Sequence, residues 1–200
     1  MKFIDLFSGI GGFRVALEKY GNKCVFSADF NKYACDTYSK NFNDYPLIDI
    51  QKYPEKKIPN HDILCAGFPC QPFSIGGKRK GFDDVRGTLF FDIVRILKEK
   101  KPKIFILENV RGLVNHNKGK TFKKIINILS NKVNNEHIKS SRENLGYNVF
   151  WKILNSKDYN IPQNRERVFI IGFKNQNINF EFPKKKLLKK SLNDLIEKKS

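Results

Sequence analysis

The sequence predicts an α/β protein built on a doubly wound, mostly parallel sheet. Short runs of strand-forming apolar residues alternate with stretches in which apolar residues recur at the helical period. This alternation is typical of parallel strands joined by crossover helices. Glycines, prolines and isolated polar residues follow the strand-like runs, and such sheets bind ligands at the carboxyl ends of their strands. A chain of 200 residues is long enough for one core of this kind and short for two.

The first two strand and helix pairs are expected close to the start of the chain. Residues 3–7 (FIDLF) predict a strand that runs into a glycine-rich turn. Apolar residues then recur at helical spacing over 13–20, and Gly21 ends that helix. Residues 24–28 predict the second strand, and aromatic and small residues at helical spacing over 33–38 predict the helix after it.

The middle of the chain continues the same order. Residues 63–66 predict a third strand, and the prolines after it force a polar loop as far as Gly87. A helix is expected over 88–99, because its leucines and isoleucines fall on one face. The apolar run 104–107 (IFIL) predicts a further strand, and 121–130 a further helix.

The last third of the chain is expected to be less regular. Residues 149–154 and 168–173 predict two more strands, which would complete a domain over residues 1–173. Residues 131–144 lack any apolar period and predict a solvated insertion. Residues 174–200 are rich in lysine and predict a basic linker or tail.

The charge of the chain favours a polyanionic partner. Lys and Arg number 38 against 20 Asp and Glu, which gives a net charge of +18; residues 101–200 carry net +14 of it and residues 1–100 net +4. Lysine and arginine contacts to phosphate supply most non-specific affinity for nucleic acids. The alternative is compositional, because an AT-rich coding sequence also enriches lysine, asparagine and isoleucine.

The cysteines and the hydropathy pattern exclude other classes. The 4 cysteines show neither the density of a disulfide scaffold nor the spacing of a zinc site, so a reducing cytosol and no metal are expected. No apolar run is long enough to cross a bilayer, so no membrane association is expected.

A nucleoside cofactor is expected at the first two strand ends. The turn around Gly9 and Gly11 lets backbone pass close to a ligand, but it fits neither G-x-G-x-x-G nor a phosphate-binding G-K-[ST] loop. Asp29 ends the second strand, where a carboxylate can bind both ribose hydroxyls, and Asp49 ends another candidate strand. Taken singly, each acid is better explained by capping or turn chemistry, and together they suggest a nucleoside cofactor.

Cys70 is the candidate nucleophile. It lies in GFPCQPFS (67–74), just past a strand end and between two prolines, where it cannot be buried as core. The other three cysteines, Cys24, Cys35 and Cys65, lie in or beside apolar runs and are expected to be structural. Nearby basic residues would favour the reactive thiolate of Cys70.

With these motifs, the chain resembles the DNA (cytosine-5)-methyltransferase family. Five motifs match in order, and they are DLFSGIGG (5–12), GFPCQPFS (67–74), GKRKGFDDVRGTLFFD (77–92), ENV (108–110) and QNRER (163–167). The resemblance covers about residues 1–173 and implies the Rossmann-like fold of S-adenosylmethionine-dependent methyltransferases.

The resemblance also implies roles for individual residues. Cys70 would add to C6 of cytosine, Glu108 would contact N3 and the exocyclic amine through a shared proton, and Arg167 would reach O2. Arg165 and Gln163 would support them. Without the cysteine loop, Glu108 would be explained as a strand-end carboxylate and the two arginines as a solvated strand edge.

The cofactor and DNA contacts follow from the same resemblance. S-adenosyl-L-methionine, with S-adenosyl-L-homocysteine as product, would be bound by Phe7, Gly9, Gly11, Asp29, Phe30, Asp49, Ile50, Pro69 and Leu89. Double-stranded DNA would be contacted by Gln71, Ser74, Lys78, Arg79 and Arg86, with the target cytosine flipped out of the helix. A flexible, solvated loop is the alternative explanation for the charged residues among these.

The family pattern continues beyond QNRER with a target-recognition region and a final asparagine-bearing segment, and the sequence contains neither. A subunit of a split enzyme, a truncated gene and a degenerate remnant are the alternatives, so a second polypeptide carrying the absent parts is a candidate partner. We expect the chain alone to bind cofactor weakly and to methylate poorly. Rival functions are a transfer RNA cytosine-5 methyltransferase and a catalytically silent nucleic-acid-binding subunit. The expected location is the cytoplasm of a bacterium, in association with the nucleoid, within a restriction-modification system.

Overall fold

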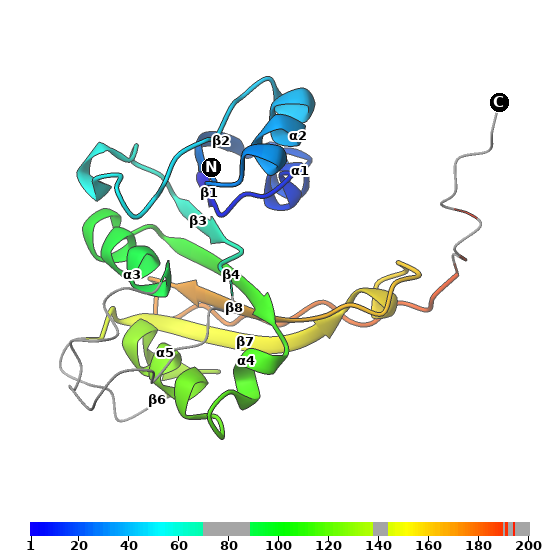
Figure 1. Ribbon diagram of the computed structural model, residues 1–200. Helices are drawn as coiled ribbons and strands as arrows, with labels where there is room; N and C mark the ends of the chain where they lie inside the picture. The colour runs from blue at the N-terminus through cyan, green and yellow to red at the C-terminus, as the bar shows by residue number, and fades with distance from the viewer. Residues whose placement is uncertain (70–88, 138–143, 190, 192–193, 195–200) are drawn as a thin grey trace.

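The computed structural model describes residues 1–69, 89–137, 144–189, 191 and 194. Within these residues, eight strands form one mixed sheet (Figure 1). The strands are β1 (Lys2–Leu6), β2 (Lys23–Ala28), β3 (Ile63–Ala66), β4 (Ile104–Val110), β5 (Ser130–Val133), β6 (Glu136–His137), β7 (Tyr147–Asn155) and β8 (Glu166–Phe173). The helices are α1 (Gly12–Glu18), α2 (Lys32–Phe42), α3 (Leu89–Lys100), α4 (Gly112–Asn115) and α5 (Lys120–Leu129), with short 3₁₀ turns at Glu55–Lys57 and Ser156–Asp158.

The strand order is β2-β1-β3-β4-β8-β7-β5-β6. The first four strands run parallel, as expected for strands joined by crossover helices. β8 pairs antiparallel with both β4 and β7, β5 pairs parallel with β7, and β6 pairs antiparallel with β5. The predicted doubly wound, mostly parallel sheet is therefore confirmed, with its antiparallel pairs all on the β8 side.

Helices cover both faces of this sheet. The larger apolar core lies on the face reached by Ile4, Leu64 and Phe105, and α3 and α5 supply its other half. A smaller cluster, made of Phe3, Ile63 and Cys65, lies on the opposite face and packs against Phe13 and Leu17 of α1. Figure 1 shows α1 and α2 beside β1 and β2 towards one end of the sheet, and α4 and α5 beside β7 towards the other. Alternate residues of β1 and β3 thus point into different cores.

The sequence explains where the helices form. α2 begins at Asn31, whose side-chain oxygen accepts a hydrogen bond from the Ala34 amide at 3.2 Å, and it ends at Asn43 in the left-handed conformation (φ 52°). α5 buries Phe122, Ile125 and Leu129, which recur every three or four residues on one face. None of the helices among the described residues has the length and apolar composition needed to cross a bilayer.

The predicted solvated insertion at 131–144 is wrong for the residues described there. Residues 130–133 form β5 and residues 136–137 form β6, and both belong to the sheet. Asn134 and Asn135 both have positive φ (49° and 69°), as a two-residue hairpin turn requires. The two strands show no apolar period because they are short, polar and close to the sheet edge.

A second expectation fails near Asp49. The candidate strand before it is reduced to a single parallel bridge between Asp29 and Leu47. Asp49 itself lies in a turn, where its carboxylate accepts a hydrogen bond from the Gln51 amide at 3.1 Å. The short apolar stretch around Leu47 and Ile48 is therefore a loop that touches the end of β2.

Candidate active site at the carboxyl edge of the sheet

The strand register brings the predicted motifs to one edge of the sheet. Leu6 pairs with both Ala28 and Ala66, and Ala66 pairs with Leu107. The residues that follow them are Phe7, Asp29, Gly67 and Glu108, which therefore lie in one row across four strands. A side chain on Gly67 would lie 3.5 Å from Oε2 of Glu108 and 3.8 Å from the Phe7 carbonyl oxygen, so these groups are close neighbours.

Glu108 and Arg167 form an ion pair at this edge. Nε of Arg167 lies 2.8 Å from Oε1 of Glu108, and the two side chains are 22% and 23% exposed. The antiparallel pairing of β4 with β8 places Arg167 opposite Val110, on the same face as Glu108. An Nη1 hydrogen bond to the Glu166 carbonyl at 2.8 Å holds the guanidinium in place. The structure thus brings together the acid and the arginine that the motifs predict.

Gln163 and Arg165 lie in the turn between β7 and β8, and both are exposed. Asn155 organises this turn from the end of β7, because its Oδ1 accepts hydrogen bonds from the amides of Lys157 and Arg165, both at 3.2 Å. Its Nδ2 donates to Asn164 at 2.7 Å. The backbone of the turn is therefore fixed, while the Gln163 and Arg165 side chains face solvent.

The turn after β1 is joined to the end of β2. Asp29 is buried, and its two carboxylate oxygens accept hydrogen bonds from the amides of Gly9 and Asn31, each at 2.8 Å. Gly11 has φ 95°, and a Cβ at this position would overlap the ring of Phe42. The turn chemistry considered for Asp29 is thus present, and lone pairs remain on each oxygen for a ligand.

The remaining predicted cofactor residues differ in exposure. Phe30 is 67% exposed, so the alternative that it is core is wrong. Ile50 and Leu89 are buried in the larger core together with Phe68. Pro69 is exposed at the end of the described segment. An open aromatic ring therefore lies beside Asp29, while Ile50 and Leu89 belong to the apolar core.

Burial raises the thiol pKa of each described cysteine. It raises the pKa of Cys24 to about 11, and it raises the pKa of Cys35 and, further still, that of Cys65. These three thiols stay protonated at neutral pH, in keeping with the structural role expected for them. Cys70 and the predicted DNA contacts Gln71, Ser74, Lys78, Arg79 and Arg86 lie outside the described residues.

Sequence reasoning missed Arg95, which holds the segment that carries Asp49 and Ile50. From α3, its Nη1 bonds to Glu55 at 2.7 Å, its Nε to Asp92 at 2.9 Å, and its Nη2 to the carbonyl oxygens of Ile50 and Tyr53. A single arginine interrupting the apolar face of a helix, three residues after an aspartate, is the signal that could have found it. Asn109 was also missed, although it stands inside the ENV motif.

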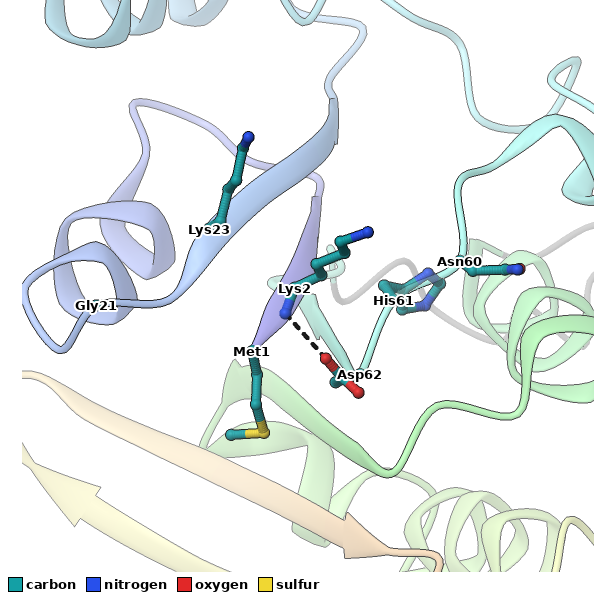
Figure 2. A pocket seen from close by; sticks show the side chains of 7 residues that line it. All are labelled: Met1, Lys2, Gly21, Lys23, Asn60, His61 and Asp62. Atoms are coloured by element: carbon teal, nitrogen blue, oxygen red, sulfur yellow. Dashed lines mark hydrogen bonds between the residues drawn. The ribbon is translucent and has the colours of Figure 1, made fainter.

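The larger described cavity lies at the opposite, amino edge of the sheet (Figure 2). It has a volume of about 540 Å³ and is lined by Met1, Lys2, Gly21, Lys23, Asn60, His61 and Asp62. Asp62 accepts hydrogen bonds from the Lys2 amide at 3.0 Å and from Nζ of Lys103 at 2.8 Å. None of the predicted site residues lines it. A cavity of about 300 Å³ beside the β7–β8 turn includes Arg111 and Glu166, which pair at 2.6 Å close to the Glu108 site.

Comparison with known proteins decides the family. The family model described as C-5 cytosine-specific DNA methylase matches residues 1–200. The chain belongs to this family. The type II methyltransferase M.HhaI of Haemophilus parahaemolyticus is 50% identical over 198 residues, which is 98% of this chain and 57% of that protein. M.HpaII of Haemophilus parainfluenzae is 52% identical over 186 residues, covering 90% of this chain and 49% of that protein. The chain thus spans about half the length of these C-5 methylase relatives.

Solved structures share the C-5 methylase fold. Spodoptera frugiperda DNMT2, as the E260A/E261A/K263A mutant, superposes with a TM-score of 0.70 at 24% identity, covering 100% of this chain and 60% of that one. Entamoeba histolytica methyltransferase EhMeth gives a TM-score of 0.70 at 23% identity, covering 100% of this chain and 61% of that one. The expected Rossmann-like methyltransferase fold is confirmed.

Proposed function

We propose that this protein transfers a methyl group from S-adenosyl-L-methionine to C5 of cytosine in DNA, releasing S-adenosyl-L-homocysteine. The observation that carries the proposal is the alignment of Glu108, paired with Arg167, with Asp29, the glycine turn and the end of β3, four residues before Cys70. Family membership supports the same activity. The chain supplies an acid and a cation on the adjacent strands β4 and β8, and a candidate nucleophile in the sequence that follows β3.

The chemistry requires a nucleophile because C5 of cytosine is weakly reactive. The Cys70 thiolate forms a bond to C6, the C5–C6 electron pair moves into the C4–C5 bond, and the N3–C4 pair takes a proton from Glu108. Glu108 binds that proton from solvent when the entering base displaces Arg167 from it. Bound S-adenosylmethionine supplies the methyl group from its sulfonium. N3 returns its proton to Glu108, and loss of the C5 proton to a base then re-forms the C5–C6 double bond and expels the Cys70 thiolate.

Arg167 and Glu108 have complementary roles in this scheme. In the free protein the guanidinium satisfies the carboxylate at 2.8 Å. When the base enters, Arg167 turns its N–H groups toward O2, where charge develops, and Glu108 faces N3 and the amine. Gln163 and Arg165, on the fixed turn held by Asn155, support the neighbouring backbone. Because both side chains already lie at the site, only their orientations change when the base enters.

The residues around Asp29 fit a methyl donor that contains adenosine. Each carboxylate oxygen of Asp29 keeps a free lone pair for a ribose hydroxyl after binding one amide. Phe30, 67% exposed, offers a face for the adenine, and Gly9 leaves open space at the turn. Asp49 and Ile50 would bind the adenine edge, with Pro69 and Leu89 completing the pocket.

The DNA target must leave the helix before Cys70 can reach C6. Gln71, Ser74, Lys78, Arg79 and Arg86 are the proposed contacts to the duplex. Because the chain spans about half the length of its relatives, sequence reading is assigned to a region outside these 200 residues, on the same or a second polypeptide. The proposed place of action is the bacterial cytoplasm, on nucleoid DNA, in a restriction-modification system.

Covalent trapping tests the proposal directly. The 200-residue chain is incubated with S-adenosylmethionine and a duplex that contains 5-fluorocytosine, which cannot lose its C5 substituent after methyl transfer. We expect a denaturation-resistant adduct with the wild type and none with Cys70→Ala. Binding of this duplex that salt abolishes, with no adduct, would instead identify a silent binding subunit.

Tritium transfer separates DNA from RNA as substrate. With labelled S-adenosylmethionine, we expect label in duplex DNA and none in transfer RNA of equal cytosine content. Label confined to the RNA would overturn the DNA assignment while leaving the chemistry intact. Cys24→Ala is the matched control, because burial holds that thiol protonated with its pKa at about 11.

A further inference from the structure

We propose that Asn109 is a positioning residue that fixes the direction in which the chain leaves β3 toward Cys70. The proposal rests on the function proposed above. Asn109 is 2% exposed, and its Nδ2 donates a hydrogen bond to the Phe68 carbonyl oxygen at 2.9 Å, across 41 positions of sequence. Phe68 stands two residues before Cys70.

The hydrogen bond between Asn109 and Phe68 connects β4 to the segment after β3, beyond the last residue pair of the β3–β4 ladder. β3 ends at Ala66, so the carbonyl of Phe68 has left the ladder that pairs β3 with β4. The Asn109 side chain replaces that ladder by one hydrogen bond from β4. The Phe68 ring is also anchored, since it is 4% exposed and its centroid lies 5.9 Å from that of Phe90. Pro69, the next residue, has no amide hydrogen with which to add a further bond.

An amide is the side chain that this position requires. While Nδ2 donates to Phe68, Oδ1 accepts the Val110 amide at 2.8 Å, so Asn109 acts as donor and acceptor at once. Aspartate keeps the acceptor and loses the donor when ionised, and leucine keeps the shape and loses both.

Asn109 also couples the two catalytic groups. Glu108 and Asn109 are consecutive in β4 and so point to opposite faces of the sheet. Glu108 is directed to Arg167, and Asn109 to the loop that carries the nucleophile. The end of β4 therefore positions both the Glu108 carboxyl group and the backbone of Phe68 that leads to Cys70. A displacement of about 1 Å between reacting groups is enough to lower the reaction rate about a hundredfold.

The test measures the rate of adduct formation on the 5-fluorocytosine duplex as a function of pH for Asn109→Asp, relative to the wild type and per mole of folded protein. At about pH 8 the ionised carboxylate repels the Phe68 carbonyl, and we expect a rate about tenfold or more below wild type. Because burial at this position raises the pKa of a carboxyl group, we expect the group to be protonated at about pH 5.5 and to donate the missing hydrogen bond, so that the ratio recovers toward one. Asn109→Leu should be slow at both values.

Among the described residues of β4 and β8, the ionisable groups around this position are paired. Glu108 pairs with Arg167 and Glu166 with Arg111, and both pairs are present in the wild type and in the variant. Asn148→Asp is the matched control, because Asn148 is fully buried in β7 and donates to the Ile178 carbonyl at 3.2 Å, away from the β3 loop. Its ratio should not change with pH.

Two outcomes overturn the inference: Asn109→Asp that follows the wild type at every pH, or Asn109→Leu that reacts as fast as the wild type. If the wild type forms no adduct, the proposed function fails and a second measurement still decides the role of Asn109. This is the rate at which iodoacetamide labels Cys70, followed by mass spectrometry without DNA or cofactor. Asn109→Leu should change it several-fold and Asn148→Leu should not, and equal rates for all three proteins would remove the positioning role.

Discussion

Asp5 is a fully buried carboxyl group in the middle of β1. Neither of its oxygens forms a hydrogen bond of normal geometry with a described residue. Burial raises its pKa well above the ordinary value of 3.8, the charge of Arg14 opposes this rise, and Asp29 adds to it. The folded state therefore binds a proton at Asp5 more tightly than the unfolded state does.

This linkage gives a prediction with a definite sign. Because the folded pKa is the higher one, the stabilising effect of proton binding is present below the unfolded value near 3.8 and is lost as pH rises through the folded value. Relative to the wild type, Asp5→Asn should therefore gain stability between about pH 4 and pH 7. Urea unfolding across this range measures it, and a difference that does not change with pH would contradict it.

Gly172 in β8 lies directly against the Phe105 ring. A Cβ at this position would overlap ring atoms of Phe105, which is fully buried and stacks edge-on against Tyr147 at 4.9 Å between centroids. Gly172→Ala should therefore cost about 2 kcal/mol of unfolding free energy. Gly112→Ala, where nothing lies within 4 Å of the added carbon, is the control and should cost nothing or stabilise α4. Equal effects in chemical denaturation would rule out the overlap.

At the scale of an element, α3 acts on the loop 49–55 through Arg95. A lysine cannot reproduce the fork that reaches Glu55, Asp92 and two carbonyl oxygens. Arg95→Lys should cost about 1–2 kcal/mol of stability. It should also weaken binding of S-adenosylhomocysteine, because Asp49 and Ile50 lie on this loop. Scanning calorimetry measures the stability and titration calorimetry the affinity, with Lys98→Ala, an exposed position on the same helix, as the control. An unchanged affinity would contradict a role of the loop in cofactor binding.

The same element scale shows what the sequence could predict. Strands buried on both faces, such as 63–66 and 104–107, are apolar throughout and were found, as were helices whose apolar residues fall on one face. The hairpin of β5 and β6 was missed because its stability comes from the turn at Asn134 and Asn135 and from the neighbouring β7, not from apolar residues of its own. Two adjacent asparagines with a strand on each side were the available signal.

The sequence predicts the reactive residues of the candidate site better than it predicts the contacts that hold them in place. Short motifs locate Glu108 and Arg167 because their chemistry demands particular residue types. Asn109 and Arg95 were missed because each donates to the backbone of a segment far away in the sequence, and only the folded chain brings donor and carbonyl together. Long-range contacts of this kind leave no local pattern.

At the scale of the whole molecule, the net charge of +18 predicts binding to duplex DNA that weakens steeply with salt. With about six phosphates contacted, affinity should fall about a thousandfold between about 50 and 200 mM salt. Replacing Lys184 and Lys186, beside the β7–β8 turn, with glutamine should lower the log–log slope by about 2. The pair Lys2→Gln and Lys23→Gln, at the opposite edge, should leave it unchanged. A slope that responds equally to both pairs would contradict binding at the carboxyl edge.

The ends of β1, β2, β3 and β4 lie side by side at one edge of the sheet, and this limits which insertions and deletions the chain can accept. Adding or deleting one residue inside β1, β3 or β4 would displace its terminal group by about 3.3 Å along the strand and turn it to the other side of the sheet. Changes in length are therefore tolerable at the amino ends of these strands and in the outer hairpin, but not between the pairing positions and Phe7, Gly67 or Glu108. Natural variants of this chain should accordingly concentrate their insertions away from that edge.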